Sequence, residues 1–518
     1  MLPWLITGFE VAIRGAGVWC AGDAIMTARS PQGSIAWVIA LLLVPEVAVP
    51  MYLIFGSRRF VGYVRMRRKG RFAINKSAAS TLEGLRPAFD PGSPSQEDPL
   101  ASLGRLVGIP ATAGNAVDIL INGEATFKAI FEAIAGAKWY LLVEFYILRN
   151  DEVGKRFQQA LKDAARRGVA VRLIYDGLGS FAYPRRAIRE LELAGVKVTA
   201  FRSYRTVRGL WRLVMPWRHY QLNFRNHRKI VVADGDVALM GGLNIGDEYL
   251  GKHKTLTPWR DTHVRLRGPS VQAVQFAWLE NWYCATSTTV DLNWAVKPAA
   301  TTARGAPACV PAGPEAVGEG GTMPPEGPPA PPTNYGESAR VLIVPSGPAD
   351  DLETCALMFE TLINHAEQRL WIATPYFVPD MATIHALQMA ALRNVDVRIL
   401  IPEGFDSRSV WLSAFTYYDD VLDAGIRLFR YQPGFMHQKV LLSDDIFAVG
   451  TANLDIRSFR INFEITALIQ NAEINGAAEA MLAEDFNRAT EVKRGAFGKM
   501  AWGFRLLAKT ARLFAPIQ

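Results

Sequence analysis

An internal duplication constrains this chain more than any other feature of its sequence. Residues 139–180 and 371–407 each read as a strand, a polar break, an amphipathic helix and a second strand. Apolar residues recur at a spacing near 3.6 in both helical parts, and the closing strands VAVRLIYD and VDVRILIP are mostly apolar. This alternation favours an α/β fold with mixed sheets, and two copies predict a duplicated, pseudo-twofold architecture.

Each copy continues into a hairpin, KIVVADGDVALMGG in the first and KVLLSDDIFAVGT in the second. The same pattern, HxKxxxxD followed by G[GT]xN, runs through both hairpins. The chain has only seven histidines, so two chance matches to this pattern are improbable. The members are His227, Lys229, Asp234 and Asn244 in the first copy, and His437, Lys439, Asp444 and Asn453 in the second.

The spacing of the pattern brings these side chains together. Residues i and i+2 of a strand point to the same face, so each histidine projects beside its lysine, and the asparagine on the return arm can meet them across the ladder. Two imidazoles, two ammonium groups and two amides suit a phosphodiester. One imidazole attacks phosphorus, the other protonates the departing alkoxide, and the cations and amides neutralise the non-bridging oxygens.

The two aspartates complete the motif and are grouped here with the candidate catalytic residues. Both Asp234 and Asp444 fall at hairpin turns. A local role in turn or inter-copy hydrogen bonding is therefore favoured over direct chemistry.

The first 75 residues read as a membrane module. Residues 34–55 are an apolar run of 22 residues with a single charge, enough to cross a hydrocarbon core of roughly 30 Å as a helix. Pro45 and Pro50 predict a kink, so a helix that enters the bilayer and turns back is an alternative. Residues 2–20 are apolar but carry two charges, and a second span and an interfacial helix both fit them.

A basic cluster follows the apolar run, whereas only Arg14 and Arg29 precede it. By the positive-inside rule, the bulk of the chain lies on the cytoplasmic side, and the cluster lies against anionic headgroups. The net charge of +8 permits an anionic partner without choosing one. The cluster consists of Arg58, Arg59, Arg65, Arg67, Arg68, Lys69 and Arg71.

Composition divides the rest of the chain. Residues 296–338 are rich in Pro, Gly and Ala and predict a flexible or polyproline-like linker. The expected domains are residues 110–295 for the first copy and 339–518 for the second. The segment KMAWGFRLLAKTARLF near the end is a basic amphipathic helix by pattern, for which membrane contact and packing on the catalytic core are equally compatible.

The cysteines give no sign of a metal site. Cys20, Cys284, Cys309 and Cys355 are far apart and form no CxxC pair, which argues against a zinc site or a disulfide scaffold. We expect no metal and no cofactor.

Longer segments resemble the phospholipase D superfamily and, within it, the bacterial cardiolipin synthases. The resemblance covers most of residues 31–515 apart from the linker, and it implies a bilobal pair of α/β/α sandwiches with one active site at their interface. It further implies that two phosphatidylglycerols are joined into cardiolipin with release of glycerol, without a metal. The segments that carry it are PQGSIAWVIALLL…PMYLIFGSRRF, VEFYI…DEVGKRF, WRDTHVRLRGP, ATPYFVPD and NLDIRSFRINFE.

The resemblance also implies partners and a location. The partners are phosphatidylglycerol and other anionic lipids of the membrane, and no nucleic acid is expected. The location is the bacterial inner (cytoplasmic) membrane, with the catalytic domains facing the cytoplasm. The oligomeric state is not implied.

Residue roles follow from the same resemblance. His227 corresponds to the histidine that forms a covalent phosphatidyl-enzyme, and His437 to the partner that protonates glycerol and then deprotonates the incoming hydroxyl; the reverse order stays open. Asp261, in WRDTH, and Glu464, in NFE, correspond to acidic residues that orient each histidine through its other ring nitrogen, with an ordinary salt bridge as the alternative. The phosphate-binding positions are Lys229, Lys439, Asn244 and Asn453.

Two other functions use the same features. A phospholipase D-type hydrolase of lipid or nucleic acid would resolve the phosphohistidine with water. A non-catalytic scaffold for anionic lipid or nucleic acid would not need two histidines facing one phosphate. The membrane module favours the transferase, which must hold a second lipid and shed water.

Overall fold

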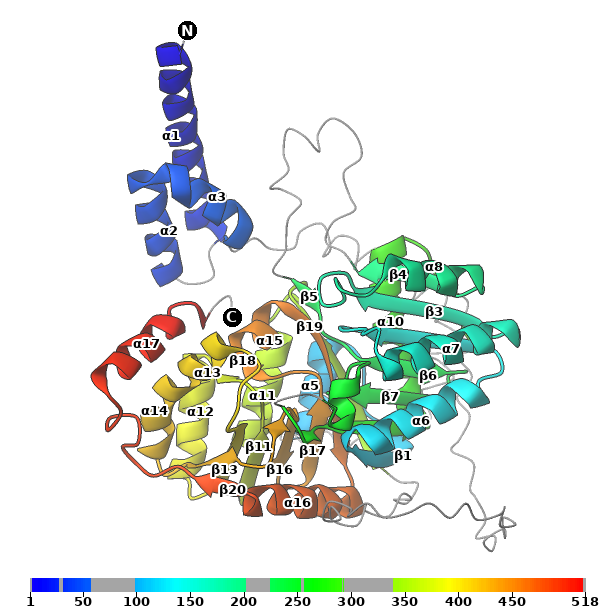
Figure 1. Cartoon of the computed structure of the whole chain (residues 1–518). Coiled ribbons are helices and arrows are strands. Elements are labelled where there is room, and N and C mark those ends of the chain that lie inside the picture. The colour runs from blue at the N-terminus through cyan, green and yellow to red at the C-terminus, as the bar shows by residue number, and fades with distance from the viewer. Residues whose placement is uncertain are drawn as a thin grey trace, which may run out of the picture.

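The computed structural model describes residues 2–27, 31–56, 98–201, 224–252, 256–290, 292 and 339–515 (Figure 1). The two copies form two lobes that share one continuous 16-stranded mixed sheet. The path through this sheet is β20-β14-β13-β11-β16-β17-β19-β10-β1-β9-β7-β6-β2-β3-β4, with β5 paired to β19. The duplicated mixed α/β fold predicted from the sequence is confirmed. The single sheet through both copies was not expected.

The first lobe carries the expected repeat and hairpin. Its strands are β1 (Thr112–Ile121), β2 (Tyr140–Phe145), β3 (Ala170–Asp176), β4 (Lys197–Phe201), β5 (Arg225–Asn226), β6 (Ile230–Ala233), β7 (Val237–Gly241), β8 (Trp259–Arg260) and β9 (Thr262–Arg267). Its helices are α6 (Asn122–Gly136), α7 (Glu152–Arg166), α8 (Arg185–Leu193), η2 (Asp247–Leu250) and α10 (Ser270–Thr286). Helix α5 (Pro99–Val107) precedes β1 in the chain but packs in the core of the second lobe.

The second lobe repeats this plan. Its strands are β10 (Ala339–Ser346), β11 (Arg369–Ala373), β12 (Phe377–Val378), β13 (Asp396–Pro402), β14 (Arg427–Tyr431), β15 (Phe435–Met436), β16 (Val440–Ser443), β17 (Ile446–Gly450), β18 (Leu454–Asp455), β19 (Asn462–Gln470) and β20 (Ala489–Glu491). Its helices are α11 (Thr354–His365), α12 (Met381–Leu392), α13 (Arg408–Ala414), η3 (Phe415–Tyr417), α14 (Tyr418–Leu422), α15 (Ile456–Arg460), α16 (Ala472–Asn487) and α17 (Trp502–Arg512).

Strand alternation explains how each lobe becomes a sandwich. Along β2, Leu141 and Val143 face an outer core under α6, α7 and α8, whereas Leu142 faces an inner core. The inner core contains residues of both α10 and α16 and therefore extends through both lobes. Strands buried on both faces must be apolar almost throughout, as the closing strands of the two repeats are.

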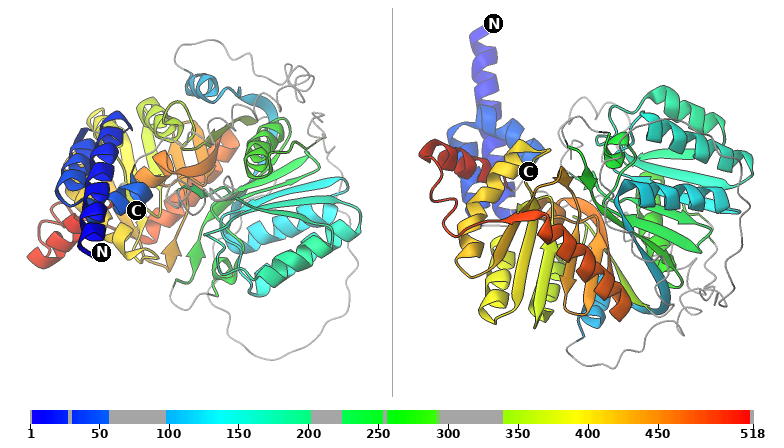
Figure 2. Two further views of the ribbon diagram at one scale, coloured as in Figure 1. Left: turned by 90° about the horizontal axis from the view of Figure 1, so that it is seen from above. Right: turned by 60° about the horizontal axis from the view of Figure 1, so that its bottom comes forward.

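The lobes join where β1 pairs antiparallel with β10, in the register Thr112↔Val341 and Asn115↔Ala339. The views in Figure 2 show the sheet passing from one lobe into the other, with helices on its faces. Asn115 is fully buried at this junction and donates through Nδ2 to the carbonyl of Ala339, at 3.1 Å. A shared sheet and a shared core fix the two hairpins relative to each other.

The N-terminal segment folds as three helices, α1 (Leu2–Thr27), α2 (Pro31–Leu43) and α3 (Pro45–Phe55). The apolar run over residues 34–55 does not form one unbroken helix: the chain breaks at Val44, just before Pro45, one of the two prolines at which the sequence predicts a kink. Tyr52 donates its hydroxyl to Asp23 Oδ2 at 2.8 Å, which ties α3 to α1. Within the described ranges, none of the helices combines the length and the hydropathy of a membrane span.

Several expectations fall on residues outside the described ranges. They are the basic cluster between residues 58 and 71, the linker over residues 296–338, and Cys309.

The aspartates of the two motifs hold hairpin turns. Asp234 adopts a φ of 55° and accepts backbone N–H groups from Lys138, Trp139 and Tyr140, at 2.7–2.8 Å. Asp444 adopts a φ of 46° and likewise accepts three N–H groups ahead of β11, from Glu367, Gln368 and Arg369. Each carboxylate therefore ties its turn to the start of the neighbouring strand. These contacts support the favoured local role in the turn, and a catalytic role for the two aspartates stays a prediction.

Replacing Asp234 with alanine tests that role. The variant loses a charged acceptor for three N–H groups. It also places alanine at a positive φ, which alanine tolerates less well than aspartate. We therefore expect the free energy of unfolding to fall by about 3 kcal/mol. Asp234→Asn should lose less, because asparagine keeps one oxygen and tolerates this φ. The thermal unfolding midpoints of the two variants in detergent check these expectations. Equal midpoints for Asp234→Ala and the unsubstituted protein would contradict the role of Asp234 in the turn.

Candidate active site

Each motif histidine leaves a strand that pairs with the opposite lobe. Strand β5 of the first lobe runs parallel to β19 of the second, and the N–H of His227 donates to the carbonyl of Phe463 at 2.9 Å. Strand β15 of the second lobe pairs with β8 of the first, and the N–H of His437 donates to the carbonyl of Arg260 at 2.7 Å. The two crossings are related by the duplication, so both histidines lie at the seam between the lobes.

The carboxylates that orient the histidines also cross the seam. His227 Nδ1 lies 2.9 Å from Glu464 Oε2. His437 Nδ1 lies 3.0 Å from Asp261 Oδ2. Each imidazole therefore takes its carboxylate from the other lobe. A carboxylate on Nδ1 holds the proton there and leaves the Nε2 lone pair for chemistry.

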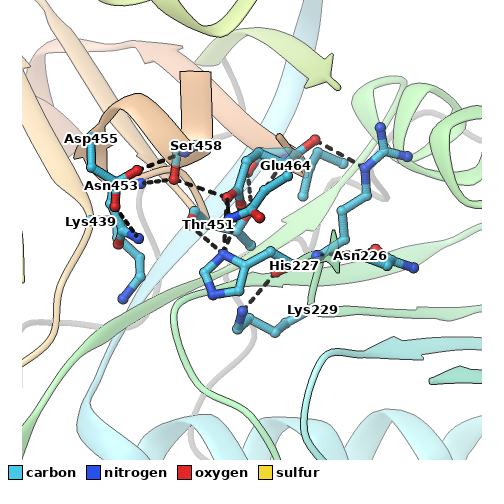
Figure 3. A network of polar contacts seen from close by, with 12 residues as sticks. Asn226, His227, Lys229, Lys439, Thr451, Asn453, Asp455, Ser458 and Glu464 are labelled. Carbon is cyan, nitrogen blue, oxygen red and sulfur yellow. Dashed lines mark hydrogen bonds and ion pairs between the residues drawn. The ribbon is translucent and has the colours of Figure 1, made fainter. Parts of the chain in front are cut away.

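Glu464 is itself held by neighbours on its own lobe (Figure 3). Ser458 Oγ and Asn462 Nδ2 each donate to Glu464 Oε1 at 3.0 Å. Thr451 adds its backbone oxygen 3.1 Å from His227 Nδ1. The side chain of Glu464 is fully buried, so its orientation is set by these contacts.

A lysine lies beside each histidine, as the i, i+2 spacing predicts. Lys229 Nζ donates to the carbonyl of His227 at 2.6 Å and lies 5.4 Å from the ring centroid of Tyr146. Lys439 Nζ donates to the carbonyl of His437 and lies 2.8 Å from its Nδ1. Both ammonium groups are buried.

Burial and mutual repulsion set the charge states of this cluster. Burial lowers the pKa of His227 to about 4, although Glu464 opposes the change. Burial also lowers the pKa of Lys229 to about 7 and that of Lys439 to about 8. Lys439 further lowers the pKa values of both His227 and Lys229, so charges from the two lobes act on one region. Two buried lysines whose charges act on one region are well placed to receive an anion.

The two carboxylates stay ionised within this region. Burial alone would raise the pKa of Glu464, but His227 and Lys229 more than offset it, so the pKa is lowered. Burial is likewise outweighed at Asp261, whose pKa Lys439 and His437 lower. Burial also lowers the pKa of His437. Both histidines are thus neutral near pH 7 in the unliganded protein, as a nucleophile must be.

The two motif asparagines are buried but engaged locally. Asn244 Oδ1 accepts the N–H of Ile147 at 3.0 Å, and its Nδ2 donates to the hydroxyl of Tyr249 at 2.9 Å. Asn453 Nδ2 lies 3.4 Å from Asp455 Oδ2, and Asn453 Oδ1 is a buried atom without a hydrogen-bond partner. Phosphate binding by these amides stays a prediction.

Aromatic rings enclose the histidines, and sequence reasoning gave them no role. The ring of Tyr146 lies 5.1 Å from that of His227, and Tyr376 lies 6.1 Å from His437. Trp259 packs 5.2 Å from His437. An alignment of the two repeats could have indicated the two tyrosines, because VEFYI and ATPYF each place one, Tyr146 and Tyr376, after the first strand of the repeat.

The two half-sites also differ in charge. Half-buried Arg225 lies two residues before His227 and acts electrostatically on Tyr146, together with Arg457 of α15. The residue at the equivalent place before His437 is Phe435, whose ring lies 5.8 Å from the imidazole.

Over the described ranges, no group of His, Cys, Asp and Glu side chains is arranged to hold a metal ion.

Comparison with known families agrees with this arrangement. Residues 130–256 and 359–486 match the family described as "Cardiolipin synthase, PLD-like domain". Residues 16–57 match the family described as "Phospholipase_D-nuclease N-terminal". The two larger matches contain one HxKxxxxD motif each.

Whole-length relatives are similar throughout. Cardiolipin synthase A of Pseudomonas aeruginosa strain LESB58 is 39% identical over 510 residues, covering 98% of this chain and 95% of that protein. Cardiolipin synthase A of Pseudomonas fluorescens strain SBW25 is 39% identical over 520 residues, covering 99% of each chain.

A solved structure shares the fold. Phosphatidylserine synthase of Haemophilus influenzae Rd KW20 superposes with a TM-score of 0.56 at 14% identity, covering 81% of this chain and 100% of that one. With the near full-length similarity to the Pseudomonas proteins, the duplicated motif and the fold show that this chain belongs to the bacterial cardiolipin synthases of the phospholipase D superfamily.

Proposed function

We propose that this phosphatidyltransferase joins two phosphatidylglycerol molecules into cardiolipin and releases glycerol, through a covalent phosphohistidine. The observation that carries the proposal is the pair of crossed contacts, His227 with Glu464 and His437 with Asp261. Two imidazoles with Nδ1 occupied by carboxylates have the Nε2 atoms available for nucleophilic attack and proton transfer at one phosphate.

In the first step, His227 Nε2 attacks the phosphorus of the donor lipid. The phosphorus–oxygen bond to the headgroup glycerol breaks as the nitrogen–phosphorus bond forms. His437 takes up a proton from solvent when the anionic donor lipid binds beside it, and gives this proton from Nε2 to the departing oxygen, so glycerol leaves neutral. Asp261 stabilises the imidazolium form of His437 before this transfer.

The second step reverses the first with a different alcohol. Neutral His437 takes the proton from a glycerol hydroxyl of a second phosphatidylglycerol. That oxygen attacks phosphorus, the bond to His227 breaks, and cardiolipin leaves with both histidines restored. Glu464 holds the ring of His227 in the same tautomer throughout.

Lys229 and Lys439 are assigned to the non-bridging oxygens, where negative charge grows in the transition state. Burial lowers the pKa values of both lysines, and Lys439 lowers that of Lys229 further, so an anion bound beside them would favour their charged forms. Asn244 and Asn453 are proposed to adjust their amides toward the same oxygens when lipid binds.

The hydrolase alternative uses the same first step, with water in the second. Burial of the catalytic groups and the aromatic rings of Tyr146, Tyr376 and Trp259 support exclusion of water and so favour transfer to lipid.

The site is proposed to work at the bacterial inner membrane, with the catalytic lobes facing the cytoplasm. Large apolar side chains are exposed along the N-terminal helices, including Trp4, Phe9, Trp19 and Ile35. Such a surface is typical of contact with lipid. The proposed divisions are residues 1–75 for the membrane module, 110–295 and 339–518 for the catalytic lobes, and 296–338 for the linker.

Lipid product analysis tests the proposed function. Purified full-length protein in mixed micelles of phosphatidylglycerol should form cardiolipin and glycerol in equal amounts. Phosphatidic acid as the main product would instead establish the hydrolase, and unchanged lipid would establish a binding protein.

Alanine at either histidine should abolish turnover. His227→Ala removes the nucleophile, and His437→Ala removes the proton donor, so each should lower the rate by roughly 1,000-fold or more. His385, an exposed histidine of α12 outside the motifs, provides the control, and His385→Gln should keep the larger part of the activity. Wild-type rates in either motif variant would refute the two-histidine assignment.

Exchange of the orienting carboxylates tests the crossed pairs. Glu464→Gln and Asp261→Asn keep shape but replace a charge by an amide, which no longer stabilises a protonated ring or fixes its tautomer. We expect each kcat to fall by roughly 100- to 10,000-fold, with KM little changed. A fall in KM alone, or an unchanged kcat, would contradict the roles given to these carboxylates.

The pH profile should reflect the lysines. As pH rises through about 7 to 8, Lys229 and Lys439 lose protons according to their lowered pKa values, so kcat/KM for phosphatidylglycerol should fall on the alkaline side. On the acid side, the pKa of about 4 keeps His227 unprotonated at pH 5. Profiles between pH 5 and 10 check this; a flat alkaline limb to pH 10 would contradict it.

A further inference from the structure

One face of α17 packs on the second lobe. Ala508 is buried in the apolar core of the second lobe, and the ring of Phe504 lies 5.1 Å from that of Phe415. Arg512 lies over the ring of Tyr417, 4.2 Å from its centroid. The expectation that the C-terminal segment forms an amphipathic helix is confirmed, and its packing on the core is one of the two alternatives considered.

The other face exposes large apolar side chains. Trp502 is 74% exposed and Leu513 is 77% exposed. Leu506 lies between them at helical spacing, half exposed, and Phe514 follows at the end. Together these four residues, called here the α17 outer face, form an apolar group of the kind that soluble surfaces seldom leave uncovered.

The segment that carries this face is basic, although one of its arginines, Arg494, pairs with Asp423 at 2.6 Å. Residues 492–518 contain no aspartate or glutamate. Basic side chains with tryptophan, phenylalanine and leucine on an amphipathic helix are typical of helices that lie in the headgroup region of a bilayer. The basic residues of this segment are Lys493, Arg494, Lys499, Arg505, Lys509 and Arg512.

A chain of contacts connects α17 to the rim of the active site. Tyr376, beside His437, donates its hydroxyl to Asp406 Oδ2 at 2.5 Å. The neighbouring Phe405 is 45% exposed and packs 5.2 Å from Trp411, whose ring in turn lies 6.2 Å from Phe504. The loop that carries Asp406 therefore lies between the catalytic seam and α17.

The helix also lies on the same side of the molecule as the apolar N-terminal helices. Figures 1 and 2 show α17, in red, next to the dark blue helices α1–α3 in each view.

We propose that the α17 outer face, together with Phe405, docks on the surface of an anionic lipid bilayer and holds the rim of the active site against it. The proposal uses one part of the proposed function, namely that the substrate is a lipid that enters the site from the bilayer. A second copy of the chain is a poorer occupant, because a twofold pairing would place the same basic face against itself.

Replacing two apolar side chains of the α17 outer face by glutamate tests the proposal by kinetics. We compare full-length Leu506→Glu/Leu513→Glu with Leu193→Glu, which changes an 80% exposed leucine at the end of α8. On vesicles of phosphatidylglycerol and phosphatidylcholine, the double variant should be at least about tenfold slower than both the control and the unsubstituted protein. On monomeric short-chain phosphatidylglycerol, all three should agree within about twofold.

These two substrates separate the possible failures. Equal rates on vesicles would overturn the docking surface while leaving the proposed function intact. Loss on the monomeric lipid as well would also overturn it, because the face would then serve folding or catalysis. A change from dimer to monomer in sedimentation would overturn it in favour of a subunit contact.

A label reports contact with lipid without reference to activity. Leu506→Cys and, as control, Leu193→Cys are labelled with an environment-sensitive fluorophore in full-length protein, and signal from the native cysteines is subtracted using the unsubstituted chain. In proteoliposomes that contain phosphatidylglycerol, spin-labelled lipid should quench the label at residue 506 and leave that at residue 193 unchanged. Equal quenching at both positions would contradict the proposal.

Discussion

Two crossed contacts between a histidine and a carboxylate determine how this site must be built. His227 of the first lobe depends on Glu464 of the second, and His437 of the second depends on Asp261 of the first. Neither lobe therefore holds a complete pair. The protein needs both copies, fixed in one relative position, before either imidazole has its orienting partner.

The fold meets that requirement through shared elements. The pairing of β1 with β10 makes one sheet of both lobes, and the inner core packs α10 and α16 against it. The short strands β5 and β15 then pair across the seam directly beside the two histidines. The catalytic cluster is thus positioned by backbone hydrogen bonds and buried apolar contacts, while its repelling lysines add no stability of their own.

The sequence predicted what depends on local pattern. The helices α7 and α12 follow from 3.6-residue periodicity, the hairpins from apolar arms around an aspartate, and the proximity of each lysine to its histidine from the i, i+2 rule. The role of Asp234 as a turn residue was also favoured from its position, although membership in the motif had placed it among the catalytic residues.

Features that depend on long-range packing could not be predicted in this way. The crossing of Glu464 to His227 joins residues more than two hundred positions apart, and no local pattern indicates which histidine each carboxylate meets. The pairing of β1 with β10 likewise has no local signal. At the N-terminus, hydropathy favoured one span, whereas Pro45 predicted a kink; the structure ends α2 at Leu43 and begins α3 at Pro45.

The identity of the residue that becomes covalently modified tests the central claim most directly. Rapid quenching of the unsubstituted full-length protein during turnover of phosphatidylglycerol, followed by peptide mass spectrometry under neutral conditions, should find a phosphatidyl group on His227, because the covalent step precedes transfer to the second lipid. Glu464→Gln should reduce the amount formed. A phosphatidyl group on any residue other than His227, or none at any time during turnover, would contradict the account.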